Sequence, residues 1–316
     1  MIRVALVGTG GWGRQHARVL SAHPEVELCA IVGRNLQRAQ QRAQEYGTRA
    51  YSDIDEMLEG EKPDLVSLCL PNQGHFEPTM KVIEAGYPLI VEKPLVFEIA
   101  EAEALLKAAG DRFFAICFNH RYAKPVRLAK EAIENGRLGD VVFATWRFGG
   151  EGSSDHPYAN LIETQCHGFD MLEHLCGPIS AISAEFTDAR TTMALSLRFA
   201  SGAVGSLVGS YDTSYAYPET QRIEISGTQG RVVIDDTVRR YRFNAAGDEL
   251  GESWEAGYFN DLDREFHRTF DFYMDATLRA FASGEAPPVH ARAGLRALQL
   301  AHAAIRSVET GSRVEV

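Results

Sequence analysis

Ionisable side chains that could move protons form a regular series in the middle of the sequence. Glu163, His167, Asp170 and His174 are offset by 0, 4, 7 and 11 residues. At about 100° per residue they fall within an arc of roughly 60° on one helix face. A carboxylate one turn before an imidazole can orient it and stabilise its charge. Glu163 and His167 could therefore form an acid–base pair.

Two other interpretations of this stripe stay open. Two histidines and two carboxylates are also metal-ligand types, so the stripe could hold a metal ion. It could equally be a solvated helix face, with an acid near the N-terminus and a histidine near the C-terminus that complement the helix dipole. In that case Asp170 and His174 would be structural only.

A lysine follows an apolar run in the first third of the chain. Glu92-Lys93-Pro94 comes directly after residues 88–91. The carboxyl end of a central strand is where open α/β sheets bind their ligands. A lysine amine there can act as a general acid or hold a substrate oxygen, and Pro94 fixes the backbone beyond it. The tripeptide is also common in exposed turns, but its place after a core strand favours a role in a site.

A glycine loop near the N-terminus predicts dinucleotide binding. Gly8-Thr9-Gly10-Gly11-Trp12-Gly13 fits the pattern Gly-x-Gly-x-x-Gly, follows the apolar run Ile2–Val7 and opens a helical stretch. Its glycines permit a tight turn and let backbone N–H groups approach a pyrophosphate at a helix N-terminus. The alternative is a strand–helix turn that is rich in glycine for packing alone.

The residues after the second apolar run favour NADP over NAD. An acidic residue that would hold the ribose 2′-hydroxyl of NAD is expected about 20 positions after the loop. Gly33 stands there instead, with Arg34 next and Arg38 one turn further on. Arginine at this point can pair with a 2′-phosphate. Both arginines could also be solvated surface charges.

The elements that must position these residues alternate regularly over the first 120 residues. Apolar runs without polar alternation suit strands that are buried on both faces, and strand–helix alternation with short connections predicts a parallel sheet covered by helices. The predicted strands are 2–7, 28–32, 65–70, 88–91 and 113–118, and the predicted helices are 14–22, 36–46, 54–58, 76–85 and 99–109.

After about residue 120 most strand patterns follow one another without helices between them, which predicts an α+β domain with a largely antiparallel sheet. Its predicted strands are 141–148, 179–186, 191–199, 204–211, 222–226 and 231–234, with a short strand at the C-terminus. Its predicted helices are 124–135, 161–175, 261–282 and 291–307, and residues 149–160 form an irregular loop.

Composition narrows the class of protein. The chain has 316 residues, a net charge of −11, 45% hydrophobic and 24% charged residues, which fits a globular protein and argues against a nucleic-acid partner. Five cysteines without a Cys-x-x-Cys pair argue against a disulfide framework and for a reducing compartment. Because there is no signal-peptide pattern and no apolar run long enough to span a membrane, we expect a cytoplasmic protein without a membrane partner.

Along nearly its whole length the sequence resembles the Gfo/Idh/MocA family of NAD(P)-dependent oxidoreductases. The resemblance rests on the segments 8–13, Pro71-Asn72-x-x-His75, Glu92-Lys93-Pro94, Asn119-His120-Arg121-Tyr122, the helix with His167 and Asp170, and residues 287–289 and 294–310. It implies an α/β fold with a Rossmann dinucleotide-binding domain over residues 1–120. It also implies an α+β substrate-binding and oligomerisation domain over residues 121–316, and a homodimer or homotetramer.

The resemblance also implies roles for individual residues. Lys93 and His167 match the family's catalytic lysine and histidine, and Glu163 would tune the imidazole. The family has Asp and Gly where this chain has Glu163 and Gln165, which suggests an altered substrate pocket. The cofactor would be bound by Gly8, Thr9, Gly10, Gly11, Trp12, Gly13, Arg34, Arg38, Leu70, Pro71, Asn72, His75, Glu92 and Lys93. The substrate would be approached by Asn119, His120, Trp146, Tyr158 and His167, although Trp146 and Tyr158 could equally be packing residues.

Together these patterns predict reversible hydride transfer between NADP(H), or NAD(H), and a hydroxyl or carbonyl carbon of a sugar, cyclic polyol or related small molecule. No metal is expected to be needed. Two alternatives remain: a non-catalytic dinucleotide-binding sensor of the same fold, and a metal-dependent enzyme that uses the stripe from Glu163 to His174.

Overall fold

The computed structural model describes residues 1–257 and 265–316 and divides the chain into two compact units. The first unit contains residues 1–117 and 271–296, and the second contains residues 118–270 and 297–316. Among the described residues, no helix is long and apolar enough to cross a membrane. The predicted fold class is confirmed: one unit is built on a parallel sheet, the other on a mostly antiparallel sheet.

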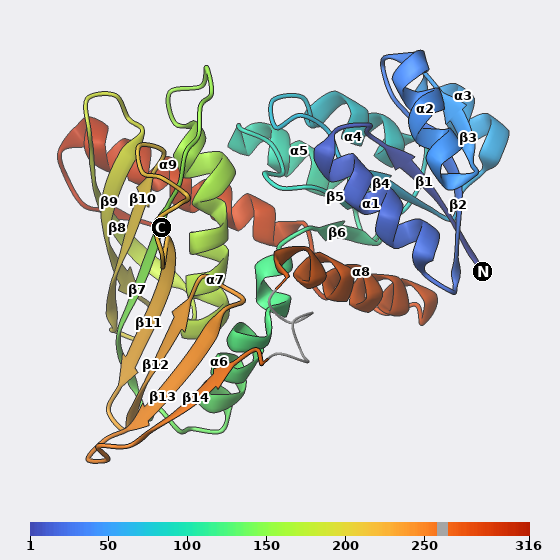
Figure 1. Cartoon of the computed structure of the whole chain (residues 1–316). Coiled ribbons are helices and arrows are strands. Elements are labelled where there is room, and N and C mark those ends of the chain that lie inside the picture. Colours follow the sequence, from blue (N-terminus) through green and yellow to red (C-terminus); the bar gives the residue numbers. More distant parts are fainter. Residues whose placement is uncertain (258–264) are drawn as a thin grey trace. The chain divides into compact units, whose positions relative to one another are not determined.

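The first unit is a six-stranded parallel sheet in the order β3-β2-β1-β4-β5-β6 (Figure 1). Its central strands consist mainly of buried apolar residues, with Ser67 as a buried polar exception, as a sheet between two helical layers requires. The strands are β1 (Ile2–Val7), β2 (Val26–Val32), β3 (Arg49–Tyr51), β4 (Leu65–Leu68), β5 (Leu89–Val91) and β6 (Phe114–Ile116).

The helices of this unit begin and end at recognisable signals. The side chain of Asn35 accepts a hydrogen bond at the start of α2, Asp53 does so at the start of α3, and Gly47 ends α2 in the left-handed conformation. The helices are α1 (Gly11–Ala22), α2 (Leu36–Tyr46), α3 (Ile54–Glu61), α4 (Phe76–Glu84) and α5 (Ile99–Ala109).

A late segment of the chain returns to the first unit. The backbone N–H of Ile116 in β6 donates to the carbonyl of Val289, and Phe113 packs edge-on against Phe281 of helix α8 (Phe266–Ala282). Asp271 of the same helix pairs with Arg18 of α1. The predicted division into two consecutive segments did not anticipate this return, because the amphipathic pattern of α8 does not say which sheet it covers.

The second unit is built on a nine-stranded mixed sheet in the order β14-β13-β12-β11-β7-β10-β9-β8-β15. All of its neighbouring strands are antiparallel except β7 and β10, which run parallel. The strands are β7 (Val141–Gly149), β8 (Ile179–Phe186), β9 (Thr192–Phe199), β10 (Val204–Ser210), β11 (Gln221–Gly227), β12 (Gly230–Asp235), β13 (Arg240–Ala245), β14 (Gly251–Glu255) and β15 (Val314–Glu315).

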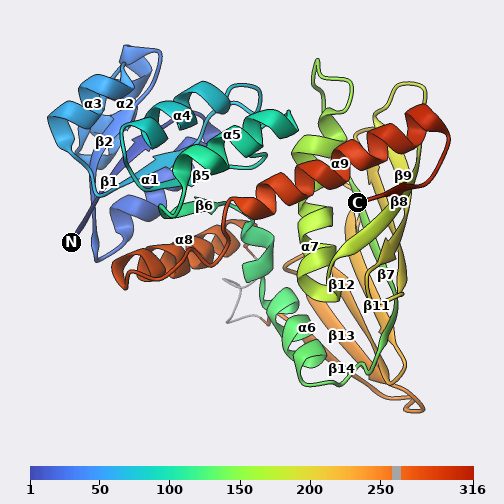
Figure 2. The same cartoon turned by 180° about the vertical axis from the view of Figure 1, so that it is seen from behind.

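Helices cover only one face of this sheet. Helices α6 (Lys124–Glu134), α7 (Cys166–Cys176) and α9 (Arg292–Thr310) lie on the same face in both views (Figures 1 and 2), and no helix of the described chain lies on the other. Inward residues of the strands, such as Trp146 and Ile223, are fully buried beneath them.

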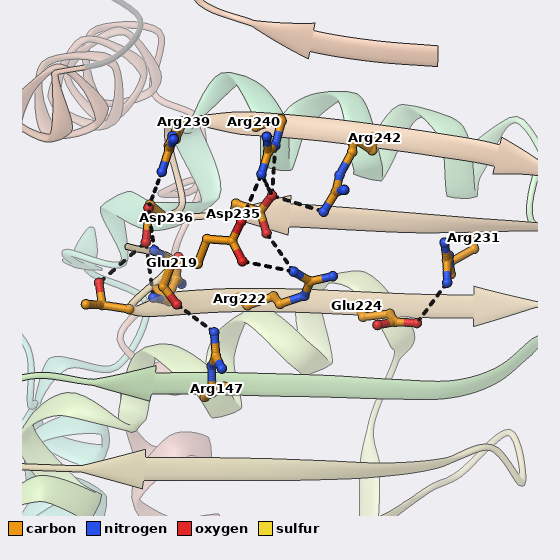
Figure 3. Close-up of polar contacts among 12 residues, drawn as sticks. Arg147, Glu219, Arg222, Glu224, Arg231, Asp235, Asp236, Arg239, Arg240 and Arg242 are labelled. Carbon is orange, nitrogen blue, oxygen red and sulfur yellow. Dashed lines mark hydrogen bonds and ion pairs between the residues drawn. The ribbon is translucent and has the colours of Figure 1, made fainter. Parts of the chain in front are cut away.

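Part of the uncovered face carries a network of ion pairs and hydrogen bonds on β7, β11, β12 and β13 (Figure 3). The carboxylate of Asp235, which has no solvent-exposed surface, pairs with the guanidinium groups of Arg222, Arg240 and Arg242 at 2.8–3.4 Å. Glu219 binds both Arg222 and Arg240 through its two oxygens. Because they share carboxylates, these arginine side chains have less conformational freedom than isolated surface arginines.

Five elements differ from the sequence-based expectation. The short strands β3, β13 and β14 were not predicted. β3 has only three residues and β14 has one large apolar residue, whereas β13 does alternate the buried Tyr241 and Phe243 with polar residues. The predicted helix 161–175 is interrupted: residues 160–164 form a π-helical turn before α7 begins at Cys166. The first residues of the predicted helix 261–282, up to residue 264, lie outside the described part of the chain, and α8 begins at Phe266.

Candidate active site

The glycine loop connects β1 to α1 in a conformation that requires glycine. Gly8 has a φ of +138°, and a Cβ there would lie 2.0 Å from the carbonyl oxygen of Cys69, so only glycine fits. A Cβ at Gly13 would lie 2.5 Å from the carbonyl oxygen of Gly8. A Cβ at Gly10 or Gly11 would meet nothing within 4 Å, so the loop is open at the N-terminus of α1, where a pyrophosphate would approach.

The end of β2 explains why an acidic residue is absent there. A Cβ on Gly33 would lie 2.6 Å from Cγ2 of Thr9 in the loop, so a side chain at this position would collide with the loop. Arg34 and Arg38 follow on the exposed surface, and neither forms an ion pair with any described residue. The backbone N–H of Arg38 donates to the side chain of Asn35, which fixes the start of α2.

Lys93 follows β5 at the same edge of the sheet as the glycine loop, since the carboxyl ends of parallel strands share one edge. Next to it Glu92 is 7% exposed, and one of its carboxylate oxygens accepts the backbone N–H of Lys93 at 3.2 Å. Leu70, Pro71 and Asn72 follow β4 at this edge.

His75 binds the backbone of the segment after β4. It is 2% exposed, and because a carbonyl can only accept, its Nε2 donates to the Leu70 oxygen at 3.0 Å. Burial lowers the pKa of His75, although contacts with backbone carbonyls and the Glu92 charge oppose this. His75 is therefore a neutral support of the segment 70–72.

In the second unit His167 lies in an aromatic cluster at the start of α7. Its ring stacks on that of His120 with centroids 3.9 Å apart and planes 8° from parallel. Phe118 packs edge-on against His167, and Phe266 packs edge-on against His120. Both imidazoles are buried, with 6% and 4% of their surface exposed. The structure thus brings together two of the predicted substrate residues, and Asn119 beside them donates its amide to Thr269 at 2.7 Å.

Gln165, where the resemblance implied glycine, is part of a buried hydrogen-bond network. Its Oε1 accepts the indole N–H of Trp146 at 2.9 Å, and its Nε2 donates to Oδ1 of Asn160 at 2.9 Å. A Cβ on Gly209 of β10 would lie 2.5 Å from the Gln165 side chain, so the glycine provides the room. The larger side chain fixes the turn before His167.

Trp146 and Tyr158, two predicted substrate residues, both pack within the second unit. Trp146 is fully buried beneath the His120 ring, with centroids 6.5 Å apart. Tyr158 lies against the edge of Phe186, and the guanidinium of Arg190 lies 4.8 Å above its ring.

The stripe from Glu163 to His174 does not form a single-helix face. Glu163 lies on the π-helical turn, whose wider spacing breaks the assumed 100° per residue, so the predicted geometry is wrong at this residue. Asp170 is committed to Arg121, whose Nε and Nη2 donate to its two oxygens at 2.9 and 2.5 Å. Within the described residues, the single group with three metal-ligand atoms inside 4.8 Å is His16, Glu92 and Cys117, so the stripe is not a gathered ligand set.

His174 is a structural histidine with an expected effect on acid stability. Burial, with the nearby charges of Arg121 and Lys130, lowers its pKa to about 3. Between the unfolded value of about 6.5 and that pKa the unfolded chain alone binds the proton, so stability is lost as the pH falls through this window. The natural chain should lose free energy of unfolding as the pH falls from 6.5 to 4. In His174→Gln we expect this loss to be about 2–3 kcal/mol smaller, as measured by urea denaturation at both pH values.

His302→Gln on helix α9 is the control for loss of a histidine as such. If the natural chain and His174→Gln lose the same free energy of unfolding between pH 6.5 and 4, His174 does not contribute to the acid sensitivity.

His16, which is linked to Lys93 through Glu92, was not among the site residues predicted from the sequence. His16 of α1 is fully buried and binds Glu92 and Ser67. A weak signal was available: Gly13, His16, Ala17 and Leu20 share the buried face of α1, so a histidine stands in the apolar stripe of an amphipathic helix.

A glycine loop between β1 and α1, with a lysine at the same edge of a parallel sheet, defines a dinucleotide-binding enzyme of the Rossmann class. Family comparison agrees. The Gfo/Idh/MocA model described as an oxidoreductase family with an NAD-binding Rossmann fold matches residues 2–114. The model for the C-terminal alpha/beta domain of the same oxidoreductase family matches residues 130–316. The chain belongs to this oxidoreductase family.

Individual relatives point to polyols and sugars. Myo-inositol 2-dehydrogenase of Thermotoga maritima is 26% identical over 100% of this chain and 98% of its own length. D-glucoside 3-dehydrogenase of Escherichia coli is 33% identical over 46% of this chain and 43% of its own length. The fold is that of levoglucosan dehydrogenase solved with NADH and levoglucosan, with a TM-score of 0.89 at 22% identity over 100% of this chain and 99% of that one.

Proposed function

We propose that this protein transfers a hydride between NADP(H) and a carbon that bears a hydroxyl or carbonyl group on a sugar or cyclic polyol. The observation that carries the proposal is the glycine loop, open at Gly10 and Gly11, at the same sheet edge as Lys93. The names of the dehydrogenase relatives, which act on inositol and glucosides, support the substrate class.

The side chains of this chain have separate tasks in that reaction. The loop residues 8–13 and the segment 70–72 would hold the cofactor, which supplies or accepts the hydride. His167 would take the hydroxyl proton in oxidation and return it in reduction. Lys93 would hydrogen-bond the same oxygen and stabilise its negative charge. Glu163, on the turn before α7, would tune the imidazole, and Asn119 and His120 would approach the substrate.

NADP is proposed as the preferred cofactor. Gly33 leaves no side chain to accept a hydrogen bond from a ribose 2′-hydroxyl, and Arg34 and Arg38 are exposed beside it. A 2′-phosphate forms charge-assisted hydrogen bonds with arginine.

The test is a separate titration with NADPH and NADH, followed by nicotinamide fluorescence. We expect NADPH to bind about 10-fold or more tightly than NADH, and Arg34→Ser to remove most of that difference while NADH affinity is kept. Arg112→Ser, on the same unit, is the matched control. Equal or stronger NADH binding would discard the NADP preference but keep the oxidoreductase, and turnover of sugars and polyols with the better cofactor would then test the reaction itself.

A non-catalytic dinucleotide sensor is the second candidate, kept open by the altered acid at Glu163, although the intact Lys93 and His167 argue against it. Any turnover across a screen of sugars and polyols would exclude it.

For assembly and location we propose a cytoplasmic homodimer or homotetramer. The uncovered sheet face carries exposed Phe143, Val204 and Val208 beside the arginine network of Figure 3, a surface on which a second copy could pack. The five cysteines are free thiols, which suits a reducing compartment. The molar mass in solution measures the assembly.

A further inference from the structure

A buried histidine joins the helix after the glycine loop to the residue before Lys93. His16 of α1 has no exposed surface. Its Nε2 lies 3.0 Å from Oε1 of Glu92, and its Nδ1 lies 2.8 Å from Oγ of Ser67 in β4. Because an ionised carboxylate can only accept, Nε2 carries the proton in this hydrogen bond. The imidazole therefore links α1, β4 and the end of β5.

Glu92 passes this constraint to the lysine backbone. Its second oxygen, Oε2, accepts the N–H of Lys93 at 3.2 Å. Burial by itself would raise the pKa of Glu92, but the hydrogen bond and charge of His16, with that of Lys93, outweigh it and lower the pKa. Glu92 thus stays an anion with one oxygen fixed by His16 and the other fixing the backbone at Lys93.

Stability alone is a poor explanation for such a pair. Taking a carboxylate and an imidazole out of water costs several kcal/mol per ion, and apolar residues of similar volume often stabilise a core as well. A metal ion is also a poor explanation, although Cys117 completes a group of three ligand types here. Both ring nitrogens of His16 already bind Ser67 and Glu92.

We propose that His16 is a positioning residue for Lys93, which acts through Glu92 to hold the lysine at the place where it meets the substrate oxygen. The proposal rests on the role given to Lys93 in the proposed function. His16 touches neither substrate nor cofactor in this scheme. Because a misplacement of about 1 Å can cost on the order of 10²-fold in rate, loss of the His16–Glu92 hydrogen bond should appear in kcat.

The first experiment compares His16→Leu with His16→Gln in steady-state turnover of the best sugar or polyol found in the screen. We expect His16→Leu to lower kcat about 10- to 100-fold, while the Kd of NADPH and the KM change by less than about 2-fold. The primary deuterium isotope effect with C4-deuterated cofactor should rise, because hydride transfer becomes slower. His16→Gln, whose amide N–H can still donate to Glu92, should keep most of kcat.

The second experiment asks whether His16 acts through Lys93. In a double-mutant cycle, His16→Leu added to Lys93→Ala should cost nothing further in kcat, because there is no amine left to position. A further loss equal to that of His16→Leu alone would overturn the proposal. So would an unchanged kcat in His16→Leu, or a loss confined to cofactor affinity.

Controls separate folding from positioning and this inference from the proposed function. Tyr87→Phe removes a hydrogen bond to Leu58 elsewhere in the same unit and should leave kcat unchanged. If His16→Leu does not fold, Glu92→Gln takes its place in the cycle, with the same expected non-additivity. An active Lys93→Ala would contradict the proposed function, whereas an inactive Lys93→Ala beside an unaffected His16→Leu contradicts the positioning role alone.

Discussion

Replacing Lys93 by alanine is expected to lower kcat by about 10²- to 10⁴-fold while NADPH still binds. The physical reason is that the amine is proposed to hold the substrate oxygen whose charge changes during hydride transfer, so its loss removes stabilisation that exists mainly in the transition state. Steady-state turnover together with the fluorescence titration measures both quantities on one preparation.

Lys81→Ala is the matched lysine control, because Lys81 forms an exposed ion pair with Asp55 on the same unit. It should turn over at the rate of the natural chain. A Lys93→Ala variant with unchanged kcat, or one that has lost NADPH binding in proportion to its activity, would contradict a catalytic role for Lys93.

Replacing Arg121 by methionine is expected to destabilise the second unit by about 3–5 kcal/mol. Asp170 has 6% of its surface exposed, and its two oxygens bind the guanidinium of Arg121. Burial already raises the pKa of Asp170, and the Arg121 charge opposes that rise. Without Arg121 the carboxylate must stay charged in a buried site or take up a proton. Urea denaturation measures the loss.

Two further variants test this explanation. The double variant Arg121→Met, Asp170→Leu should recover most of the lost stability, since an apolar pair no longer leaves a buried charge unpaired. Arg313→Met, which removes an exposed ion pair with Glu315, should cost about 0–1 kcal/mol. If Arg121→Met and Arg313→Met lose the same free energy of unfolding, the buried ion pair contributes no more to stability than the exposed one.

The sequence was sufficient for the parallel sheet and for the place of the glycine loop between β1 and α1. Strands such as β1 and β4 are short apolar runs that are buried on both faces, and the glycine pattern between β1 and α1 has a local geometric cause at Gly8. Features set by neighbouring residues in the chain could therefore be predicted. Lys93 could be placed because it follows such a strand directly.

Features that depend on contacts between distant segments could not be predicted. His16 and Glu92 are 76 residues apart, and only the fold brings them within 3.0 Å. Similarly, Asp170 was counted with a proton-transfer stripe, whereas Arg121, 49 residues earlier, holds it. The π-helical turn before α7 was missed because helical periodicity assumes one fixed spacing along the whole segment.

Because residues 271–296 return to the first unit, neither unit can be produced from one continuous piece of the sequence. The chain passes from one unit to the other after residues 117, 270 and 296, so neither unit is one continuous stretch. A cut after residue 117 would remove the segment around Val289, whose backbone bonds to β6, and leave that edge of the sheet open. An exchange that keeps the first unit whole would therefore have to move residues 271–296 together with the first 117 residues.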